Sequence, residues 1–458
     1  MPLEEYTILG AGISGLSASY HLGHKVCRIF EANNYAGGHA FTHRVDSVDW
    51  DEGPHVSFTK NKYVKKLFEE STNGEFSEFP VDVSNYYFGS FIPHPAQSNL
   101  SFIKEPLRTQ CYEQILSKSS MKQPEYLRSY SEWLESSFGN IFTENFSERY
   151  TKKYWTISTK ELAIDWLGER IYRPDPHIVE NGYRGIQPVK THYINTVRYP
   201  KSGGFVSFLD KLKNGANIEY SHCVEAIDLE KKQITFTNGK VTAFNKLINS
   251  LPLPQFISLA GAPQEILEAA NKLDCTSLLL INIVANNRLK KDFNWMYVYD
   301  DTMYSTRITS MKSLAPNANL SSPEGIQVEV YESKFRPFDR DHAEIAEHVR
   351  VELEEMGVID SCLSIHTKYI RNANVIFNHR RRKNQDIVLN WLANYGLYRE
   401  FDDLEPMSNW THLTDNSLIK EMGALILAGR FGQWKYFWSD DCVLRGLEIG
   451  LINKKLNI

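Results

Sequence analysis

An α/β fold, in which one domain is assembled from separated segments, is the class that the sequence predicts. Three observations support it. A short apolar strand, a glycine-rich turn and a helix open the chain, and a second strand, turn and helix close it over residues 425–450. Short β-type runs between residues 275 and 335 predict an antiparallel sheet. With 458 residues and 42% hydrophobic content, the chain can bury a large core in two or three domains.

Composition and charge narrow the functional classes. The net charge of -5 shows no basic surplus, so we expect no nucleic-acid partner. The six cysteines lie far apart, without metal-ligand or redox spacing, so we expect no metal site. We also expect the thiols to be reduced and the protein to be cytoplasmic. The acidic N-terminus does not resemble a signal peptide. The longest apolar run, residues 278–285, is too short to span a membrane.

The first residues of the chain predict a dinucleotide site. Gly10 allows a tight turn, Gly12 lets the backbone approach a pyrophosphate, and Gly15 lets helix and strand pack closely. The phosphates would sit on the helix N-terminus. Glu31 ends the second strand, where it can accept hydrogen bonds from a ribose, and this acid argues against a 2′-phosphate there.

Two glycines after Glu31 favour FAD over NAD. The stretch that follows the acid carries the pair Gly37-Gly38, as in large FAD proteins in which a second loop touches the flavin side. The plain alternative is a flexible turn.

Two later segments also favour FAD. Residues 223–252 read as a strand, a meander with a turn at Asn238-Gly239, and a further strand, and the backbone of Val224 is expected to pair with the adenine. Gly429 and Arg430 form a turn before the C-terminal helix, which places a helix N-terminus beside an anionic cofactor. The FAD-binding domain is therefore predicted to be Rossmann-like and discontinuous, with a helical insertion and an antiparallel-sheet substrate domain.

The predicted domains divide the chain into five segments. Three of them, residues 1–89, 199–262 and 420–458, together form the FAD-binding domain. Residues 90–198 form the mainly helical insertion, and residues 263–419 form the antiparallel-sheet substrate domain. A helix is expected near residues 342–359 within the substrate domain.

A helix is also predicted over residues 158–171. Ser158 and Glu161 have the spacing of a capping box, and Trp166 and Leu167 fall on one apolar face. Arg170 ends that face. Its stem could lie along the core with its head in water, favoured by the helix dipole, or it could bind an anion.

Five segments, in order, give the chain a family resemblance. They are residues 10–43, residues 51–63, residues 150–171, residues 295–308 and residues 429–436. Together they resemble the flavin-dependent UDP-galactopyranose mutases, especially the larger eukaryotic type, within the superfamily of amine oxidases and protoporphyrinogen oxidases.

The resemblance implies roles for individual residues. It implies that His55 lies against the flavin and that Arg170 and Arg307 are catalytic. It places Arg430 near the FAD pyrophosphate. The implied substrate-binding residues are Trp155, Trp295, Tyr297 and Tyr436.

One segment departs from the family pattern. Asn378 and His379 stand where the family keeps a tyrosine for the diphosphate, and the basic run 380–383 follows them. The run is either a solvated face or an anion site. The departure leaves open which nucleotide sugar, or which other anion, is bound.

The family's chemistry defines what the site must do. The resemblance implies a mutase that interconverts the pyranose and furanose forms of a nucleotide-diphosphate sugar. The reaction would pass through a flavin N5–sugar adduct on reduced FAD, without a net redox change. NAD(P)H is a candidate reductant for the FAD. It also implies a place in cell-surface polysaccharide biosynthesis. Arginines suit the diphosphate because the guanidinium forks onto phosphate oxygens and stays charged. Tyrosines would donate hydrogen bonds, and tryptophans would stack on the base or the sugar.

Other interpretations stay open. The chain could be an FAD oxidase or dehydrogenase of the amine or protoporphyrinogen type, or a flavin-binding protein that has lost catalysis. Taken singly, the tryptophans and tyrosines are ordinary core residues, Arg307 is a solvent-facing strand residue, and His55 is a buried or capping histidine.

Overall fold

The parallel sheet of the first domain is drawn from separated segments of the chain. The computed structural model describes residues 5–119, 126–168, 171–186, 195–286, 293–315, 323–414 and 422–456. The sheet has the order β19-β13-β1-β2-β9, and all its strand pairs are parallel. Its strands are β1 (Tyr6–Leu9), β2 (Cys27–Phe30), β9 (Ile218–Glu219), β13 (Lys246–Asn249) and β19 (Leu425–Leu427). The predicted α/β class and the discontinuous Rossmann-like domain are confirmed.

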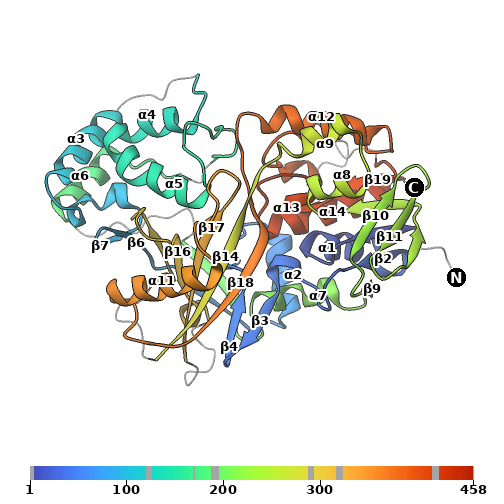
Figure 1. Cartoon of the computed structure of the whole chain (residues 1–458), viewed down its shortest axis with the longest axis horizontal. Helices are drawn as coiled ribbons and strands as arrows, with labels where there is room; N and C mark the ends of the chain where they lie inside the picture. Colours follow the sequence, from blue (N-terminus) through green and yellow to red (C-terminus); the bar gives the residue numbers. More distant parts are fainter. Residues whose placement is uncertain are drawn as a thin grey trace.

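Two helices from opposite ends of the chain pack together on this domain (Figure 1). They are α1 (Ile13–Leu22) and α14 (Ser439–Leu456). Glycines allow the close approach, because a Cβ at Gly446 would lie 2.2 Å from the Ser17 hydroxyl and one at Gly450 would lie 2.6 Å from the Cβ of His21. The last segment of the chain therefore completes the domain that the first segment begins.

Smaller elements surround this core. The meander predicted after residue 223 is a three-stranded antiparallel sheet, and Gly239, with φ +81°, takes part in its predicted turn. Its strands are β10 (Val224–Asp228), β11 (Gln233–Phe236) and β12 (Val241–Ala243). Two further strand pairs belong here, the hairpin of β3 (Thr42–Val45) with β4 (Val48–Asp51) and the pair of β5 (Phe76–Pro80) with β8 (Thr196–Pro200). The remaining helices are α2 (Lys62–Ser71), α7 (Asp210–Lys213), α8 (Leu253–Leu259), α9 (Gln264–Ala270) and α13 (Gly429–Gly432).

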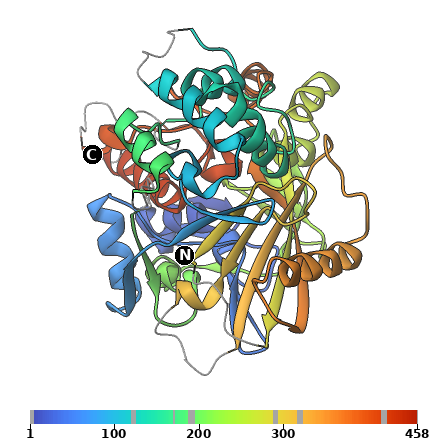
Figure 2. The ribbon, with the colours of Figure 1, turned by 90° about the vertical axis from the view of Figure 1, so that its left-hand side faces the viewer.

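The second sheet has the order β18-β14-β17-β16-β15-β6-β7 and is antiparallel except at the β15–β6 pair. Its strands are β6 (Val83–Tyr87), β7 (Ser90–Pro93), β14 (Cys275–Ala285), β15 (Trp295–Val298), β16 (Arg307–Ser310), β17 (Glu324–Glu332) and β18 (Cys362–Val375). The predicted helix near residues 342–359 is α11 (His342–Glu355), which covers one face of the sheet (Figure 2). The strands β6 and β7 lie on either side of the expected boundary at residues 89/90 and both belong to this sheet.

A helical lobe lies above the second sheet in Figures 1 and 2. It consists of α3 (Leu107–Ser119), α4 (Tyr130–Phe142), the π-helical turn Thr143–Ser147, α5 (Glu148–Tyr154) and α6 (Pro176–Arg184). Two further helices, α10 (Met311–Leu314) and α12 (Arg381–Ala393), belong to the region predicted as the substrate domain, and α12 packs against α9.

The helix predicted over residues 158–171 is wrong for its described residues. Residues 158–168 form turns, although Glu161 still accepts from the Ser158 amide at 3.3 Å as in a capping box. The backbone is diverted because the Ala163 amide donates to the Phe377 carbonyl at 2.9 Å, and Leu162 bridges to Asn378. Tertiary hydrogen bonds have overridden local propensity. Arg170 lies outside the described residues.

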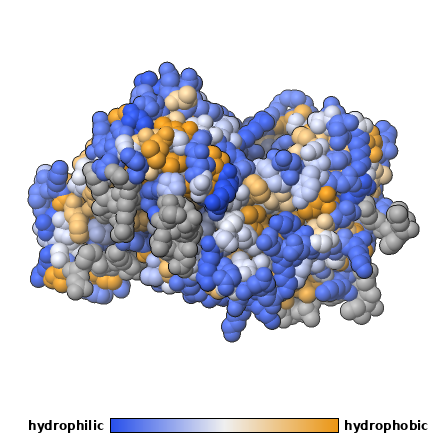
Figure 3. All heavy atoms as spheres, turned by 90° about the horizontal axis from the view of Figure 1, so that it is seen from below, coloured by the Kyte–Doolittle hydropathy of each residue, from blue (hydrophilic) through white to orange (hydrophobic). Residues whose placement is uncertain are grey.

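None of the helices in the described ranges combines the length and the apolar character needed to cross a bilayer. The face in Figure 3 is mostly hydrophilic, with apolar areas limited to small patches. All six cysteines are free thiols.

Candidate active site

A cavity of about 610 Å³ lies between the parallel-sheet domain and the second sheet. It brings together most of the residues that the sequence singled out. Those in its wall are Gly10, Gly12, Glu31, Gly37, Gly38, His55, Trp295, Tyr297, Arg307, Gly429, Arg430 and Tyr436.

The opening glycine turn lies at one end of this first cavity. Gly10 has φ +94°, which favours glycine, and Gly12 precedes α1, whose first residues line the wall. A Cβ at Gly15 would lie 2.1 Å from the Gly10 carbonyl oxygen, so only glycine fits there. The helix N-terminus thus faces the cavity at close range, as a diphosphate requires.

Glu31 is held in a fixed orientation at the edge of the same cavity. Its carboxylate accepts from the Ala11 amide at 2.8 Å and from the amide and side chain of Asn33 at 2.9 and 2.8 Å. A carboxylate has about four acceptor positions, so capacity remains for a ribose hydroxyl. The side chain is 6% exposed.

The Gly37-Gly38 loop packs directly against the first glycine turn. The Gly37 amide donates to the Ala11 carbonyl at 2.9 Å, and a Cβ at Gly38 would lie 3.0 Å from the Cα of Gly12. The two glycines have φ of +131° and +56°. The loop is therefore a fixed element of the cavity wall rather than a loose turn.

The closing motif supplies a cationic wall. Gly429 has φ +86°, and a Cβ there would lie 2.6 Å from the Ser14 hydroxyl. Arg430 donates through Nη2 to Asn374 Oδ1 at 2.9 Å and lies 5.1 Å from the Tyr436 ring centre. Its Nε is buried and has no partner among the described residues. A buried unpaired donor in the wall that also contains the N-terminus of α1 fits the diphosphate of a bound FAD.

Two predicted cofactor residues lie outside the cavity wall. Gly15 acts through packing, as described above. Val224 is half-buried at the start of β10, where it pairs with Phe236 ahead of a register irregularity. The contact of Val224 with adenine therefore stays a prediction.

Arg307 is held by a carboxylate that the sequence did not single out. Glu329 faces it across the β16–β17 pair and accepts from Nε at 2.6 Å and from Nη2 at 2.7 Å. Nη1 has no hydrogen-bond partner within the described ranges. Burial opposes the charge of Arg307, but the Glu329 carboxylate raises the pKa of the guanidinium above its ordinary value. Arg307 therefore stays charged and presents one edge to the cavity.

His55 also lines the first cavity. Its Nδ1–H donates to the Gly53 carbonyl at 3.0 Å, which leaves Nε2 as the acceptor nitrogen of the neutral ring. Burial lowers the pKa of His55 to about 4, so the imidazole is neutral near pH 7.

A second cavity of about 220 Å³ adjoins the first. Tyr154, Tyr297, Arg307 and Tyr436 line both cavities. The remaining wall of the second cavity is mostly aromatic, with a few polar side chains. It is formed by His94, Pro95, Gln97, Tyr130, Phe138, Phe142, Ser147, Tyr150, Thr151, Trp155, Trp166, Ile171, Tyr172 and Tyr299.

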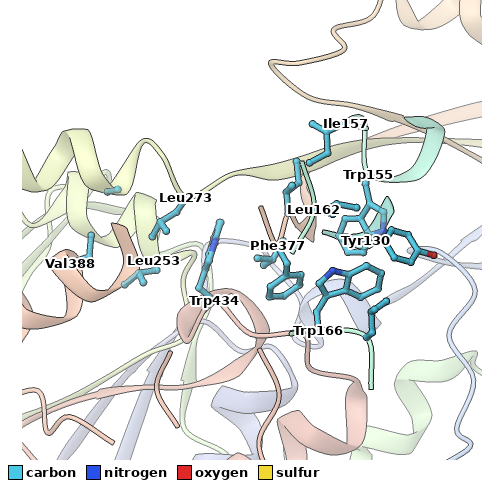
Figure 4. Close-up of a cluster of buried hydrophobic side chains, with 14 of the residues drawn as sticks. Tyr130, Trp155, Ile157, Leu162, Trp166, Leu253, Leu273, Phe377, Val388 and Trp434 are labelled. Atoms are coloured by element: carbon cyan, nitrogen blue, oxygen red, sulfur yellow. The ribbon is translucent and has the colours of Figure 1, made fainter. Parts of the chain in front are cut away.

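Trp155 belongs to this second cavity and to the core behind it. Its ring centre lies 5.3 Å from that of Trp166, 5.8 Å from that of Tyr436 and 6.2 Å from that of Phe377. Figure 4 shows Trp155 and Trp166 near Phe377, with Tyr130 beside them. Trp155 is therefore a core ring that also forms part of a cavity wall, and its contact with a substrate stays a prediction.

Hydrogen bonds connect the tyrosines to the cofactor side. Asn374 Oδ1 accepts from the Tyr154 hydroxyl at 3.2 Å and from Arg430 at 2.9 Å. Trp295 donates through Nε1 to the Tyr297 hydroxyl at 3.1 Å, which leaves that hydroxyl free to donate its own proton. Burial raises the pKa of Tyr297, so the phenol stays protonated.

The basic run 380–383 lines neither cavity. Arg380 pairs with Asp274 at 2.6 Å, and Arg382 pairs with Glu405 at 2.9 Å. Arg381 is 1% exposed and donates to Asp165, Gln385 and the Leu404 carbonyl at 2.8–3.0 Å. Arg381 is thus a buried support behind the second cavity, whereas Arg380, Arg382 and Lys383 are exposed, as expected of a solvated face.

Among the wall residues that the sequence did not predict as site residues are Tyr154, Trp166, Glu329 and Asn374. Tyr154 and Trp166 stand inside the segment that already drew attention, so their aromatic character was an available signal. Glu329 was marked only by a charge within the apolar strand 324–332, and Asn374 by nothing in its surroundings.

One family model covers more than half of the chain. A family model described as flavin containing amine oxidoreductase matches residues 13–369. The chain belongs to this family. The protein is therefore an FAD-dependent enzyme of the amine oxidase superfamily.

Solved structures share the fold. Reduced UDP-galactopyranose mutase aligns over 100% of this chain and 94% of its own, with 21% identity and a TM-score of 0.86. The putative protoporphyrinogen oxidase from Exiguobacterium sp. 255-15 covers 100% of both chains, with 15% identity and a TM-score of 0.71. The predicted resemblance to the mutases is thus confirmed for the fold.

Curated relatives match over a shorter range. L-amino acid oxidase Bs29 of Bothriechis schlegelii is 27% identical over 237 residues, which is 49% of this chain and 42% of that protein. An L-amino-acid oxidase of Vipera ammodytes ammodytes is 27% identical over 46% of this chain and 39% of its own. The chain thus spans less than half the length of these relatives.

Proposed function

We propose that this enzyme interconverts the pyranose and furanose forms of a nucleotide-diphosphate sugar. The observation that carries the proposal is the position of Arg307, at the junction of an FAD-sized cavity and an aromatic cavity, with one guanidinium edge left for an anion. The fold likeness to UDP-galactopyranose mutase supports it.

Each residue of the junction has a task in this reaction. Arg307 would hold the diphosphate as it leaves the sugar, and its charge cannot be lost at any physiological pH. Tyr297 and Tyr436 would add hydroxyl donors, and the aromatic second cavity would enclose flat or apolar portions of the substrate. Bound FAD, once reduced, would supply the nucleophile that ring opening needs. Because the diphosphate must return, the chain has to retain it rather than release it.

Two predicted residues complete the proposal. Trp155 would contact the substrate from the second cavity. Arg170, outside the described residues, would be a second diphosphate ligand; Ile171 and Tyr172, which follow it in sequence, line the second cavity. The six free thiols fit a reducing cytoplasm, where we place the enzyme.

A second candidate is an L-amino-acid oxidase. Sequence matches to such oxidases over about half of this chain favour it. A carboxylate is also an anion that a guanidinium binds through two hydrogen bonds, so Arg307 would suit an amino-acid substrate as well.

One experiment separates the two candidates. The FAD-loaded protein is reduced anaerobically with dithionite and given UDP-, GDP- and dTDP-linked hexopyranoses, and furanose products are sought by chromatography. In parallel, the oxidised protein is given L-amino acids in air, and hydrogen peroxide is measured. Turnover that requires reduced flavin supports the mutase. Stoichiometric peroxide without any furanose product contradicts it.

A further inference from the structure

Among the described acids that line the first cavity, only Glu329 forms hydrogen bonds with an arginine of the proposed substrate site. Its side chain is 2% exposed and that of Arg307 is 21% exposed, so the carboxylate is the more deeply buried member of the pair. Both oxygens of Glu329 are engaged, at 2.6 and 2.7 Å, in a two-point contact that fixes the plane of the guanidinium. The contact leaves Nη1 at the exposed edge.

The carboxylate also lies against the loop that carries His55. A Cβ at Gly53 would lie 3.1 Å from Glu329 Oε1, and the Gly53 carbonyl is the acceptor for His55 Nδ1. Glu329 is therefore packed between the second sheet and this loop, with little room to turn away from Arg307. A fixed negative charge remains close to wherever Arg307 binds an anion.

The other acids that line this cavity have partners elsewhere. Glu52 is bound by His39 at 2.9 Å and by Lys368, and Glu31 is bound by amide donors at the opposite glycine turn. Arg430 contacts Asn374 and Tyr436 on the cofactor side. Among the described residues that line this cavity, Arg307 and Glu329 are therefore the charged pair of the proposed substrate end.

We propose that Glu329 determines specificity by charge: it orients Arg307 and disfavours anions that carry more charge than a nucleotide sugar. This inference rests on the proposed function. A free nucleoside diphosphate has an ionised terminal phosphate and therefore one negative charge more than its sugar ester near neutral pH. A nearby carboxylate repels that added charge, so the site binds the intact nucleotide sugar in preference to the bare nucleotide. Repulsion built against a competitor is a common source of specificity.

The size of the effect follows from electrostatics. At an effective dielectric constant of about 20, one additional unit charge at a separation of roughly 10 Å changes affinity by about tenfold. Replacing Glu329 by glutamine removes the charge and keeps the shape. Both ligands should then bind more tightly, but the free nucleotide should gain about tenfold more than the sugar ester.

The test measures binding to the FAD-loaded protein by calorimetry, with UDP against UDP-galactose and with GDP against GDP-mannose. In Glu329→Gln the dissociation constant of the free nucleotide, divided by that of its sugar ester, should fall by about tenfold. Glu332→Gln is the matched control on the same strand, because Glu332 bonds to Tyr369 and Phe338 and lines neither cavity. Its ratio should equal that of the wild type.

A second variant separates charge from position and covers the case in which Glu329→Gln does not fold. Glu329→Asp keeps the charge on a shorter side chain, so it should keep the wild-type ratio while turnover of the reduced enzyme falls and KM changes little. If the ratio of dissociation constants in Glu329→Gln equals that of the wild type, or if Glu329→Asp changes it as Glu329→Gln should, this inference is overturned while the proposed function stands. If the wild-type protein binds neither pair of ligands, the proposed function falls and this inference falls with it.

Discussion

The two cavities are built in different ways. The first is walled at its cofactor end by backbone and glycine from motifs that are continuous in sequence, where an added Cβ at Gly38 would lie 3.0 Å from the Cα of Gly12. Gly15 supports this wall from behind, since a Cβ there would lie 2.1 Å from the Gly10 carbonyl oxygen. The second is walled by large side chains from α4, α5, β15 and the segments near residues 166 and 436. Backbone fit allows few replacements, whereas a wall of side chains can change its lining without changing the fold. Cofactor binding and substrate choice should therefore respond to mutation independently.

The largest expected effect is on the first cavity. Gly15→Ala places a methyl group within 2.1 Å of the Gly10 carbonyl and must separate α1 from the glycine turn. We expect loss of bound FAD, measured as loss of flavin absorbance in the purified protein. Gly239→Ala is the control for a glycine replacement away from both cavities, since an added Cβ at Gly239 would have no atom within 4 Å. Equal flavin content in both variants would show that the turn does not hold the cofactor.

The second largest effect is expected at Arg307, which lines both cavities. Arg307→Ala should keep FAD but lower turnover of the nucleotide sugar by about 100- to 1,000-fold, the usual cost of removing a donor to developing negative charge. Arg382→Ala, an exposed arginine paired with Glu405, should leave the rate unchanged. Steady-state kinetics of the reduced proteins measure the turnover of both variants. Near wild-type activity in Arg307→Ala would show that Arg307 does not bind the substrate.

A smaller effect concerns the support of the second cavity. Arg381→Met leaves Gln385 Oε1 and the Leu404 carbonyl without their donor, which should lower the free energy of unfolding by about 2–4 kcal/mol. Arg382→Met breaks only an exposed ion pair and should cost about 0–1 kcal/mol. Urea unfolding of both variants checks this difference. Equal stabilities would mean that Arg381 is not a buried support.

The smallest expected effect depends on pH. Because burial lowers the pKa of His55 to about 4, the unfolded chain binds a proton between pH 6.5 and 4 that the folded protein does not. The stability associated with neutral His55 is therefore complete above pH 6.5 and is lost as the pH falls toward 4. His55→Asn should reduce the loss of stability between pH 7 and pH 5, measured by urea midpoints. The same loss in both proteins would place the His55 pKa near its ordinary value.

The difference between the cavities also explains what could be predicted from the sequence. The glycine turns, Glu31 and Arg430 are local patterns whose geometry follows from short-range rules, and the structure brings them to one wall. The helix at residues 158–171 could not be predicted correctly, because the hydrogen bond from Ala163 to Phe377 joins residues more than 200 positions apart. The pairing of Glu329 with Arg307 depends on strand register, which no single segment reveals. The partners of the basic run, Asp274, Asp165 and Glu405, are likewise distant or unmarked in the sequence.

The most direct test of the central claim is a crystal structure of the reduced, FAD-loaded protein with a bound nucleotide-diphosphate sugar. We expect the diphosphate to lie within hydrogen-bond distance of Arg307 Nη1, between the flavin and the aromatic second cavity, with Tyr436 beside it. A sugar nucleotide bound elsewhere, or Arg307 in contact with Glu329 alone while the ligand lies in front of the flavin, would contradict it.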